Sequence, residues 1–332
     1  MTKRFLVTGA DGFIGSHVVE GLLAMGHSVR AMALYDPRGR HGWLDDIDAC
    51  AGDIETVSGD IRDRETVFRA VENCDAVLHL AALVGIPYSY VAPESYLDTN
   101  IQGTLNVLQA VRSHGTAQLV CTSTSEVYGT AQFVPITEDH PLNAQSPYAA
   151  TKIAADQLAL SYHRSFGTPV AIARPFNTYG PRQSARAVIP TIINQIASGA
   201  RSIKLGALTP TRDFSFVKDT ARGLIAAATN PRAIGEVINL GSAFEISIQD
   251  TATLIAQVMG VTIKILRDEK RIRPNASEVE RLFAANAKAK ALLDWEPKFG
   301  GHEGLARGIE TTAAWFAEPD RVNSRAAQEY AI

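Results

Sequence analysis

A carboxylate and several hydroxyl side chains stand together in STSEVYG, residues 123–129, directly after the apolar run QLVCT. The carboxylate belongs to Glu126, and Thr124 and Ser125 precede it. A carboxylate at the end of a buried strand is unfavourable unless it is paired or used chemically. The segment therefore predicts a chemical role for Glu126, with hydroxyl groups beside it to orient a substrate.

Three glycines occur at the spacing G-x-x-G-x-x-G in VTGADGFIG, at Gly9, Gly12 and Gly15. They follow the first predicted strand and open the first predicted helix. There, small residues let the backbone turn tightly, and the helix N-terminus offers free N–H groups to a pyrophosphate. The segment predicts a dinucleotide site, although ordinary dinucleotide dehydrogenases use the spacing G-x-G-x-x-G.

The residues after the second predicted strand bear on which dinucleotide is bound. The first acid there is Asp36 in LYDPRGR, and an acid at this position bonds the adenosine ribose in many dinucleotide folds. Arg38 and Arg40 follow it and could equally meet a 2′-phosphate. We expect NAD as the cofactor, with NADP left open.

A tyrosine and a lysine are spaced for joint proton chemistry in SPYAATK, where Tyr148 and Lys152 are four residues apart. On a helix this spacing projects both side chains from one face. Tyrosine has a pKa of about 10, so a base near pH 7 needs roughly 4 kcal/mol of preferential phenolate stabilisation. The Lys152 ammonium and a positive nicotinamide ring are suitable sources. We expect Tyr148 to accept the proton of a sugar hydroxyl as hydride leaves its carbon, with Thr124 bonded to the same oxygen.

Short apolar runs alternate with amphipathic helical stretches in the first half of the chain. We expect strands at 4–8, 28–34, 56–60, 76–82, 118–124 and 170–175, and helices at 13–25, 63–72, 98–114 and 147–166. Strands that are apolar on both faces and separated by helices predict a parallel sheet covered on both sides. That is a doubly wound α/β fold, which binds ligands at the carboxyl ends of its strands.

The composition and pattern of the sequence change after Pro175, where predicted loops rich in Arg, Asn, Thr and Pro begin. We expect residues 1–175 to form a cofactor-binding Rossmann domain and 176–318 to form a smaller, mainly substrate-binding portion interleaved with it. The second portion contains a predicted helix near 188–199 and a strand near 202–206. EVINLG predicts that residues 236–241 return to the central sheet, and 319–332 form a polar tail.

Composition excludes several classes of partner. The 332 residues carry a formal net charge of -3, and basic residues are scattered among acids, which argues against nucleic acid as a partner. No apolar run approaches the roughly 20 residues that span a bilayer. Cys50, Cys74 and Cys121 lack metal-ligand spacing and suit reduced thiols, so we expect a cytoplasmic protein without a metal site.

Taken together, the motifs resemble the extended short-chain dehydrogenases/reductases, in the branch that modifies nucleotide-activated sugars. The resemblance covers about residues 3–316 and includes TGADGFIG, GDIRD, HLAA, STSEVYG, PYAATK, RPFNTYGPRQ, RDFSFVKD and NLGS. It implies that the reacting groups are Thr124, Ser125, Glu126, Tyr148 and Lys152. It implies cofactor contacts from Gly9, Gly12, Phe13, Ile14, Gly15, Asp36, Asp60, Ile61, Leu80, Ala81, Ala82, Asn100, Thr122, Tyr148, Lys152 and Pro175. It implies a nucleotide-sugar site containing Tyr88, Glu126, Asn177, Arg182, Val188, Lys204, Arg212 and Arg273.

Glu126 divides this branch by reaction. Sugar 4-epimerases usually have small or hydroxyl residues at its position, whereas 4,6-dehydratases keep a glutamate to take the proton from C5. Ser125 stands where dTDP-glucose-type dehydratases usually have Asp, and the order Thr-Ser-Glu is typical of GDP-mannose-type dehydratases. Serine is far too weak an acid to donate a proton. The resemblance therefore implies that Glu126 takes the C5 proton and passes it to the departing C6 hydroxyl, which Ser125 orients.

Several alternatives stay open at this point. UDP-xylose synthases, which decarboxylate UDP-glucuronate, also resemble STSEVYG, and 4-epimerases resemble the whole chain. A non-enzymatic NAD-binding module is disfavoured because the reacting residues are all present. The segments PYSYVAPESYLDTN and GPRQSARAVIPTII most resemble dehydratases of nucleotide-linked N-acetylglucosamine. The family commonly forms homodimers, and residues 98–114 and 147–166 have apolar faces that suit such a contact.

Overall fold

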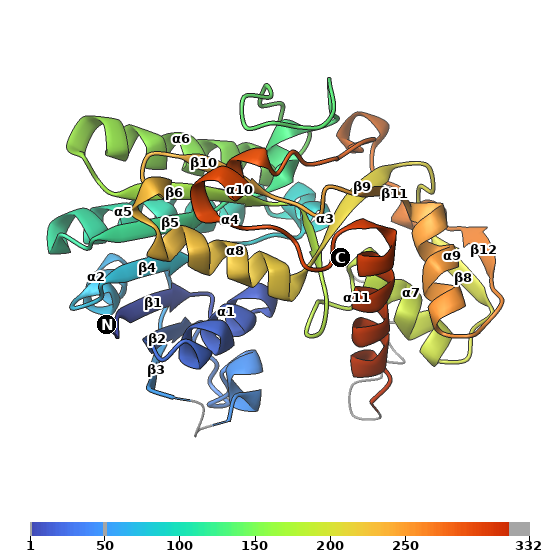
Figure 1. The fold of residues 1–332 in the computed structure, drawn as a ribbon, viewed down its shortest axis with the longest axis horizontal. Helices are drawn as coiled ribbons and strands as arrows, with labels where there is room; N and C mark the ends of the chain where they lie inside the picture. The colour runs from blue at the N-terminus through green and yellow to red at the C-terminus, as the bar shows by residue number, and fades with distance from the viewer. Residues whose placement is uncertain (1, 49–51, 319–332) are drawn as a thin grey trace.

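A seven-stranded parallel sheet forms the centre of the computed structural model, which describes residues 2–48 and 52–318 (Figure 1). The strand order is β10-β6-β5-β4-β1-β2-β3, and every pairing in this sheet is parallel. The strands are β1 (Arg4–Thr8), β2 (Ser28–Ala33), β3 (Ile54–Ser58), β4 (Ala76–His79), β5 (Gln118–Thr122), β6 (Val170–Pro175) and β10 (Val237–Leu240). The predicted doubly wound α/β fold is confirmed.

The chain reverses its direction across the sheet between β1 and β4, which lie side by side. From β1 it runs outward through β2 to β3, then returns to β4 and continues through β5 and β6 to β10. In open α/β sheets, the crevice outside the carboxyl ends of strands at such a reversal is where ligands bind. The glycine loop follows β1 and HLAA ends β4, so both predicted motifs lie at this crevice.

Alternating strand residues cover the two faces of the sheet. Phe5 and Val7 pack with α1 (Phe13–Ala24), α8 (Val217–Thr229) and α10 (Ala287–Leu293). Leu6, between them, packs in a separate cluster on the other face, with α2 (Arg64–Val71), α5 (Gly103–His114) and α6 (Pro147–Phe166). Successive side chains of a strand point to opposite faces, so a strand that is apolar throughout requires cover on both sides.

The second portion of the chain builds a smaller body beside the carboxyl ends of the strands (Figure 1). Its core is made by α7 (Val188–Ala197), α9 (Ile248–Val258) and α11 (Gly301–Phe316). It also contains a three-stranded sheet of β7 (Asn177–Tyr179), β9 (Thr211–Phe216) and β11 (Glu245–Ser247), and a pair of β8 (Ser202–Leu205) and β12 (Lys264–Arg267). The interleaving predicted for 236–241 goes further than β10, because α8 and α10 also pack on the central sheet.

The long helix α6 has clear boundary signals. Ser146 precedes it and accepts a hydrogen bond from the Ala149 N–H, and Pro147 occupies the first turn, where its missing N–H is not needed. Gly167 ends the helix in the left-handed conformation. These signals explain why the expected range 147–166 agrees with the structure.

The chain between β4 and α5 is more irregular than expected. Two short helices, α3 (Ile86–Val91) and α4 (Pro93–Tyr96), lead into a π-helical turn at Leu97–Gln102 and then α5. The expected single helix at 98–114 is therefore partly π-helical. Short 3₁₀ turns complete the list of elements, at Gly42–Asp46, Ser125–Tyr128, Pro231–Ala233, Glu269–Arg271 and Asn275–Ser277.

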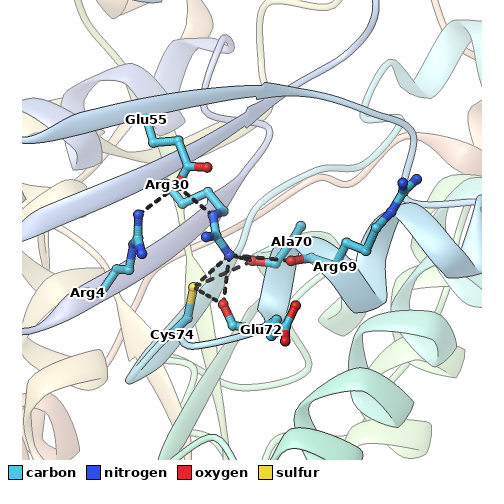
Figure 2. Close-up of polar contacts among 7 residues, drawn as sticks. All are labelled: Arg4, Arg30, Glu55, Arg69, Ala70, Glu72 and Cys74. Atoms are coloured by element: carbon cyan, nitrogen blue, oxygen red, sulfur yellow. Dashed lines mark hydrogen bonds and ion pairs between the residues drawn. The ribbon is translucent and has the colours of Figure 1, made fainter.

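Arg30 joins three elements near the amino ends of the strands, away from the crevice (Figure 2). From β2 it donates hydrogen bonds to the carbonyl oxygens of Ala70 and Glu72, each at 2.8 Å, at the end of α2. Its Nε also lies 2.8 Å from the carboxylate of Glu55 on β3, which Arg4 meets at 2.7 Å. A cation at the carbonyl end of a helix satisfies orphan acceptors and complements the helix dipole.

Cys74 and Cys121 are buried and free, whereas Cys50 and the tail 319–332 lie outside the described residues. In the described part of the chain, none of the helices has the length and apolar character to cross a membrane. Within the same residues, there is no cluster of three or more His, Cys, Asp or Glu side chains that could hold a metal ion.

Candidate active site

Tyr148 and Lys152 lie on the first half of α6, and both are buried. The Lys152 ammonium donates a hydrogen bond to the carbonyl oxygen of Thr122, the last residue of β5, at 2.8 Å. Burial lowers the pKa of Lys152, and the negative charge of Asp156, one turn later on α6, acts in the opposite direction. The lysine is thus held at the carboxyl end of the central strand.

The Tyr148 hydroxyl lies near the side chain of Thr124, close enough for Thr124 to affect the pKa of Tyr148. Burial raises the pKa of Tyr148 above its usual value, the Thr124 side chain opposes this, and the charge of Glu126 adds to it. The chain alone therefore does not make Tyr148 a base near pH 7. The phenolate stabilisation expected from the sequence must come with the bound ligands, because positive charge favours the ionised form.

Glu126 lies in the 3₁₀ turn Ser125–Tyr128, which begins three residues after β5. Thr124 caps the turn, its hydroxyl accepting the Glu126 N–H at 3.2 Å. Glu126 is only 8% exposed and Ser125 only 2%, so both side chains face inward. The Glu126 carboxylate is near enough to affect the pKa of Tyr148 and of Arg212, so it lies in the neighbourhood of both the tyrosine and a cation.

Two arginines meet one carboxylate beside Glu126. Arg212 on β9 is buried and pairs with Glu278 at 2.9 Å, and Arg273 lies 3.7 Å from the same carboxylate. Burial lowers the pKa of Arg212, whereas Glu126 and Glu278 act in the opposite direction. Nη1 of Arg273 is buried without a hydrogen-bond partner. Together they form a cationic site that lacks ligands for part of its donor set.

The other residues expected to hold the sugar nucleotide are dispersed. Arg182 has a positive φ of 71° and pairs with Glu20 of α1 at 2.6 Å, so it lies against the cofactor-binding side. Asn177 begins β7, and its Oδ1 is buried without a hydrogen-bond partner. Lys204 is exposed on β8, and Val188 is the first residue of α7.

Three tyrosine rings, those of Tyr88, Tyr96 and Tyr148, lie in sequence from the surface to the buried site. Tyr88, on α3, is 40% exposed, and its ring centroid lies 6.2 Å from that of Tyr96. Tyr96 is fully buried and lies 6.3 Å from Tyr148 in an edge-to-face arrangement. Tyr88 is therefore at the outer end of a path to Tyr148.

The glycine loop approaches β4 so closely that side chains would not fit. Gly9 has φ +66°, and a Cβ there would lie 2.8 Å from the backbone nitrogen of Ala81. A Cβ on Gly15 would lie 2.0 Å from the carbonyl oxygen of Gly9. Gly12 caps α1, whose first residues are Phe13 and Ile14. The loop and the N-terminus of α1 thus present backbone N–H groups at the crevice, as a pyrophosphate requires.

The acids expected near the adenosine are already paired with arginines. Asp36 accepts hydrogen bonds from Nε and Nη2 of Arg38, both at 2.9 Å, which lowers the pKa of Asp36 to about 2. Arg40 lies 3.7 Å from the same carboxylate. Asp60 is paired in the same way with Arg62 at 2.6 Å, and Ile61 beside it is buried.

His79 is a buried residue at this crevice that received no role from the sequence beyond its place in HLAA. Its Nδ1 lies 2.8 Å from the Thr8 hydroxyl, and its Nε2 lies 3.1 Å from the Thr104 hydroxyl. Thr104 donates its proton to the Asn100 carbonyl at 2.6 Å, so it accepts the proton of His79 Nε2. Thr8 then donates to Nδ1 and accepts the N–H groups of Leu80 and Ala81. These bonds assign His79 as neutral, and burial lowers its pKa to about 3.

Asn100 extends this network toward α6. Its Oδ1 accepts the N–H of Leu83, and its Nδ2 donates to the Thr151 hydroxyl at 3.0 Å. Thr151 donates in turn to the carbonyl oxygen of Tyr148. The Asn100 side chain thus links the segment after β4 to α6.

The residues present fit a dinucleotide at the crevice. The glycine loop has no room for side chains at Gly9 and Gly15, and Ala82 lies just after β4. Thr122 and Pro175 end the neighbouring strands β5 and β6, and the Thr122 hydroxyl is buried without a partner. A buried polar atom without a partner is unfavourable unless a ligand completes it.

Comparison with known proteins agrees with this arrangement. A family model described as GDP-mannose 4,6 dehydratase matches residues 6–307. The chain is 34% identical over 323 residues to a dTDP-glucose 4,6-dehydratase of Streptomyces griseus, covering 95% of this chain and 94% of the relative. It is also 34% identical over 316 residues to a UDP-glucuronate 4-epimerase of Thermodesulfobacterium geofontis, covering 92% and 94%.

A solved structure is similar along nearly the whole chain. It is a dTDP-glucose 4,6-dehydratase from Streptomyces venezuelae, crystallised as a double mutant with NAD bound. The two are 29% identical, with a TM-score of 0.85, and the match covers 95% of this chain and 97% of the other.

Proposed function

We propose that this chain, which belongs to the GDP-mannose 4,6-dehydratase family, is a nucleotide-sugar 4,6-dehydratase. More broadly, it is an enzyme of the NAD-dependent nucleotide-sugar dehydratase and epimerase superfamily. The observation that supports the narrower reaction is the buried Glu126 carboxylate in the neighbourhood of Tyr148 and Arg212. An elimination needs a base at this point, whereas an epimerisation at C4 does not.

Tyr148 removes the proton of the C4 hydroxyl while C4 loses hydride. When bound, NAD supplies the hydride acceptor and donor and a positive charge in the site. Thr124, whose side chain lies near Tyr148, orients the same sugar oxygen. The Lys152 ammonium, fixed by Thr122, adds positive charge to the site and favours the phenolate.

Glu126 acts after C4 has become a ketone, which makes the C5 proton acidic. The carboxylate takes that proton, and the electron pair of the C5–H bond forms a double bond between C5 and C6. The C6–O bond breaks, and Glu126 returns the proton to the departing hydroxyl, so water leaves. Ser125, 2% exposed and adjacent to Glu126, orients that hydroxyl. Hydride then returns to C6 and a proton to C5, giving a 4-keto-6-deoxy sugar.

Arg212 and Arg273 hold the diphosphate of the nucleotide sugar. Guanidinium groups suit phosphate because their fork can bond bidentately. Glu278 keeps both cations in place before binding, and Nη1 of Arg273, which lies 3.7 Å from Glu278 without forming a hydrogen bond, can donate to a phosphate oxygen. We propose Tyr88, Asn177, Arg182, Val188 and Lys204 as further contacts, and N-acetylglucosamine as the sugar, from the sequence motifs. A homodimer and a cytoplasmic location stay predictions.

The similarity to a UDP-glucuronate 4-epimerase keeps epimerisation as a second candidate function. Decarboxylation of a uronic acid stays a third alternative because STSEVYG resembles that group as well. A panel of nucleotide sugars, followed by product mass, separates the three reactions. A dehydratase product has lost one water, an epimerase product keeps its mass, and a decarboxylase releases carbon dioxide. An unchanged product mass, with inverted C4, would contradict the dehydratase proposal.

A further inference from the structure

A buried ion pair lies one helical turn beyond Lys152, where Asp156 of α6 meets Arg174 of β6. Asp156 on α6 and Arg174 on β6 are 1% and 2% exposed. One carboxylate oxygen of Asp156 accepts Nε of Arg174 at 3.1 Å and Nη2 at 3.0 Å. It also accepts the Ser123 hydroxyl at 2.8 Å. A pair at this depth is stable only when its remaining donors also find partners.

The remaining donor of Arg174 reaches the turn that carries Glu126. Nη1 donates to the phenol oxygen of Tyr128 at 2.9 Å, and the guanidinium carbon lies 4.9 Å from the Tyr128 ring centroid. Tyr128 is fully buried and ends the 3₁₀ turn that begins at Ser125. Its hydroxyl donates in turn to Oδ1 of Asn239 on β10 at 2.8 Å. Arg174 therefore contacts α6 on one side and the Glu126 turn on the other.

These contacts matter because the reacting groups come from two separate elements. Tyr148 and Lys152 are on α6, whereas Glu126 is on the turn after β5. Misplacing a reacting group by about 1 Å can lower a rate by about 100-fold. The hydrogen bonds of the Arg174 and Tyr128 side chains go to Asp156, to each other and to Asn239, none of which has a predicted contact with cofactor or substrate. Their effect on the reaction therefore passes through the position of other residues.

We propose that the Asp156–Arg174–Tyr128 bridge holds Glu126 in register with Tyr148, and that Tyr128 and Arg174 are positioning residues for proton removal from C5. This rests on the proposed function, in which Glu126 is the C5 base. The bridge acts on the elimination step. The C4 oxidation depends on residues of α6 and on Thr124, which precedes the turn.

The variant Tyr128→Phe tests the bridge with little loss of packing. It removes only the hydroxyl that joins Arg174 to the turn, while the ion pair with Asp156 stays complete. Tyr179→Phe is the matched control, because Tyr179 is also fully buried but its hydroxyl donates to the Leu305 carbonyl in the second portion. Both variants lose one buried hydroxyl, so a general loss of stability affects them alike.

Hydrogen exchange of the ligand-free protein is the first measurement. Amides of residues 124–129 should exchange at least about fivefold faster in Tyr128→Phe, because the variant loses both hydrogen bonds of the hydroxyl, the one from Arg174 and the one to Asn239. Those of 147–166 should stay at the wild-type rate, and Tyr179→Phe should match wild type in both segments. Unchanged exchange at 124–129, or equal acceleration in both segments, would overturn the bridge.

The second measurement is the isotope effect of deuterium at C5 of the substrate. In Tyr128→Phe, kcat should fall about tenfold with KM unchanged, and the C5 isotope effect on kcat should exceed that of wild type. An increase in the C4 isotope effect instead, or wild-type kcat, would overturn the assignment to C5. If the wild-type enzyme removes no water, the proposed function and the kinetic assignment fail together, while hydrogen exchange still decides whether the bridge exists.

Discussion

Lys152 donates its ammonium proton to the carbonyl oxygen of Thr122 at a distance of 2.8 Å. This bond connects α6 to the end of β5, two residues before Thr124 and four before Glu126. The lysine thus has a structural contact as well as its proposed electrostatic role. The same bond fixes where the ammonium lies relative to Tyr148, four residues earlier on the helix.

Tyr148→Phe should abolish the first oxidation, because it removes the proposed base and leaves the ring packing intact. We expect kcat to fall by about 10²–10⁴-fold, the usual contribution of a positioned acid or base. Binding of NAD, measured by calorimetry, should stay near the wild-type value. Tyr162→Phe, on the same helix and half-buried, is the matched control and should retain wild-type kcat. Comparable rates in both variants would make Tyr148 a structural residue.

Arg273→Ala should weaken binding of the nucleotide sugar. Loss of one charge-assisted hydrogen bond costs on the order of 1.5–3 kcal/mol, which raises KM by roughly 10- to 150-fold. Arg267→Ala is the control, because Arg267 is an exposed arginine on β12 that pairs with the exposed Glu269. Steady-state kinetics should show the rise in KM for Arg273→Ala alone. An unchanged KM there would contradict the placement of the diphosphate.

His79 should make the folded protein less stable as pH falls. Its folded pKa of about 3 lies below the unfolded value of about 6.5, so only the unfolded state gains a proton between these values. The stabilisation is complete above about pH 6.5 and is lost as pH decreases toward 3, by about 1.4 kcal/mol per pH unit. His79→Gln should lack this dependence, since glutamine does not titrate.

Urea unfolding of both proteins across this pH range measures the effect. The free energy of unfolding of wild type minus that of His79→Gln should decrease by about 2–3 kcal/mol between about pH 6.5 and 4.5. Other titrating groups are the same in both proteins, so their contributions cancel. A constant difference would mean that His79 is charged in the folded state.

Arg30→Ala should lower stability without affecting catalysis, because Arg30 lies near the amino ends of the strands. It loses the bonds to the α2 carbonyls and to Glu55, so we expect about 1.5–3 kcal/mol less free energy of unfolding. Arg69→Ala is the control, since the Arg69 side chain points away from the cluster (Figure 2). Thermal unfolding and kcat measured side by side test the expectation, and a fall in kcat for folded Arg30→Ala would contradict it.

The fold was predictable where local chemistry marks the boundaries. Gly12 and Gly167 cap helices, Ser146 accepts a first-turn N–H, and the first four residues of β6, VAIA, form a continuous apolar run. The edge strand β3 was less clear. It spans Ile54–Ser58 and was expected at 56–60, because its alternation is weak when one side of the strand has no neighbour. After β3, a Cβ on Gly59 would lie 2.4 Å from Thr66 and 2.8 Å from Met32, a close approach that no local pattern reveals.

The candidate site was predictable as a set of residue types, but its partners were not. Thr124, Tyr148 and Lys152 stand in recognisable motifs, whereas Asp156 and Arg174 are 18 residues apart and meet only in the folded chain. Glu278 likewise lies 66 residues from Arg212. The pairing of Arg182 with Glu20 shows the same limit, since α1 and the segment after β7 meet only through the packing of both portions.

Glu126→Gln keeps the size of the side chain but removes the base. We expect it to oxidise C4 and to stall before water is lost. Deuterium at C4 of the substrate should leave the sugar in this variant without appearing at C6. Turnover by Glu126→Gln at the wild-type rate would mean that Glu126 only forms hydrogen bonds. Other residues would then determine which reaction the enzyme catalyses.

The fate of the C4 hydrogen tests the central claim most directly. A nucleotide sugar deuterated at C4 is converted by the wild-type enzyme, and the product is analysed by mass and by NMR. The dehydratase account predicts loss of one water and deuterium at C6, with solvent hydrogen at C5. Deuterium returned to C4, in a product with the same mass as the substrate, would contradict the account and assign the chain as a 4-epimerase.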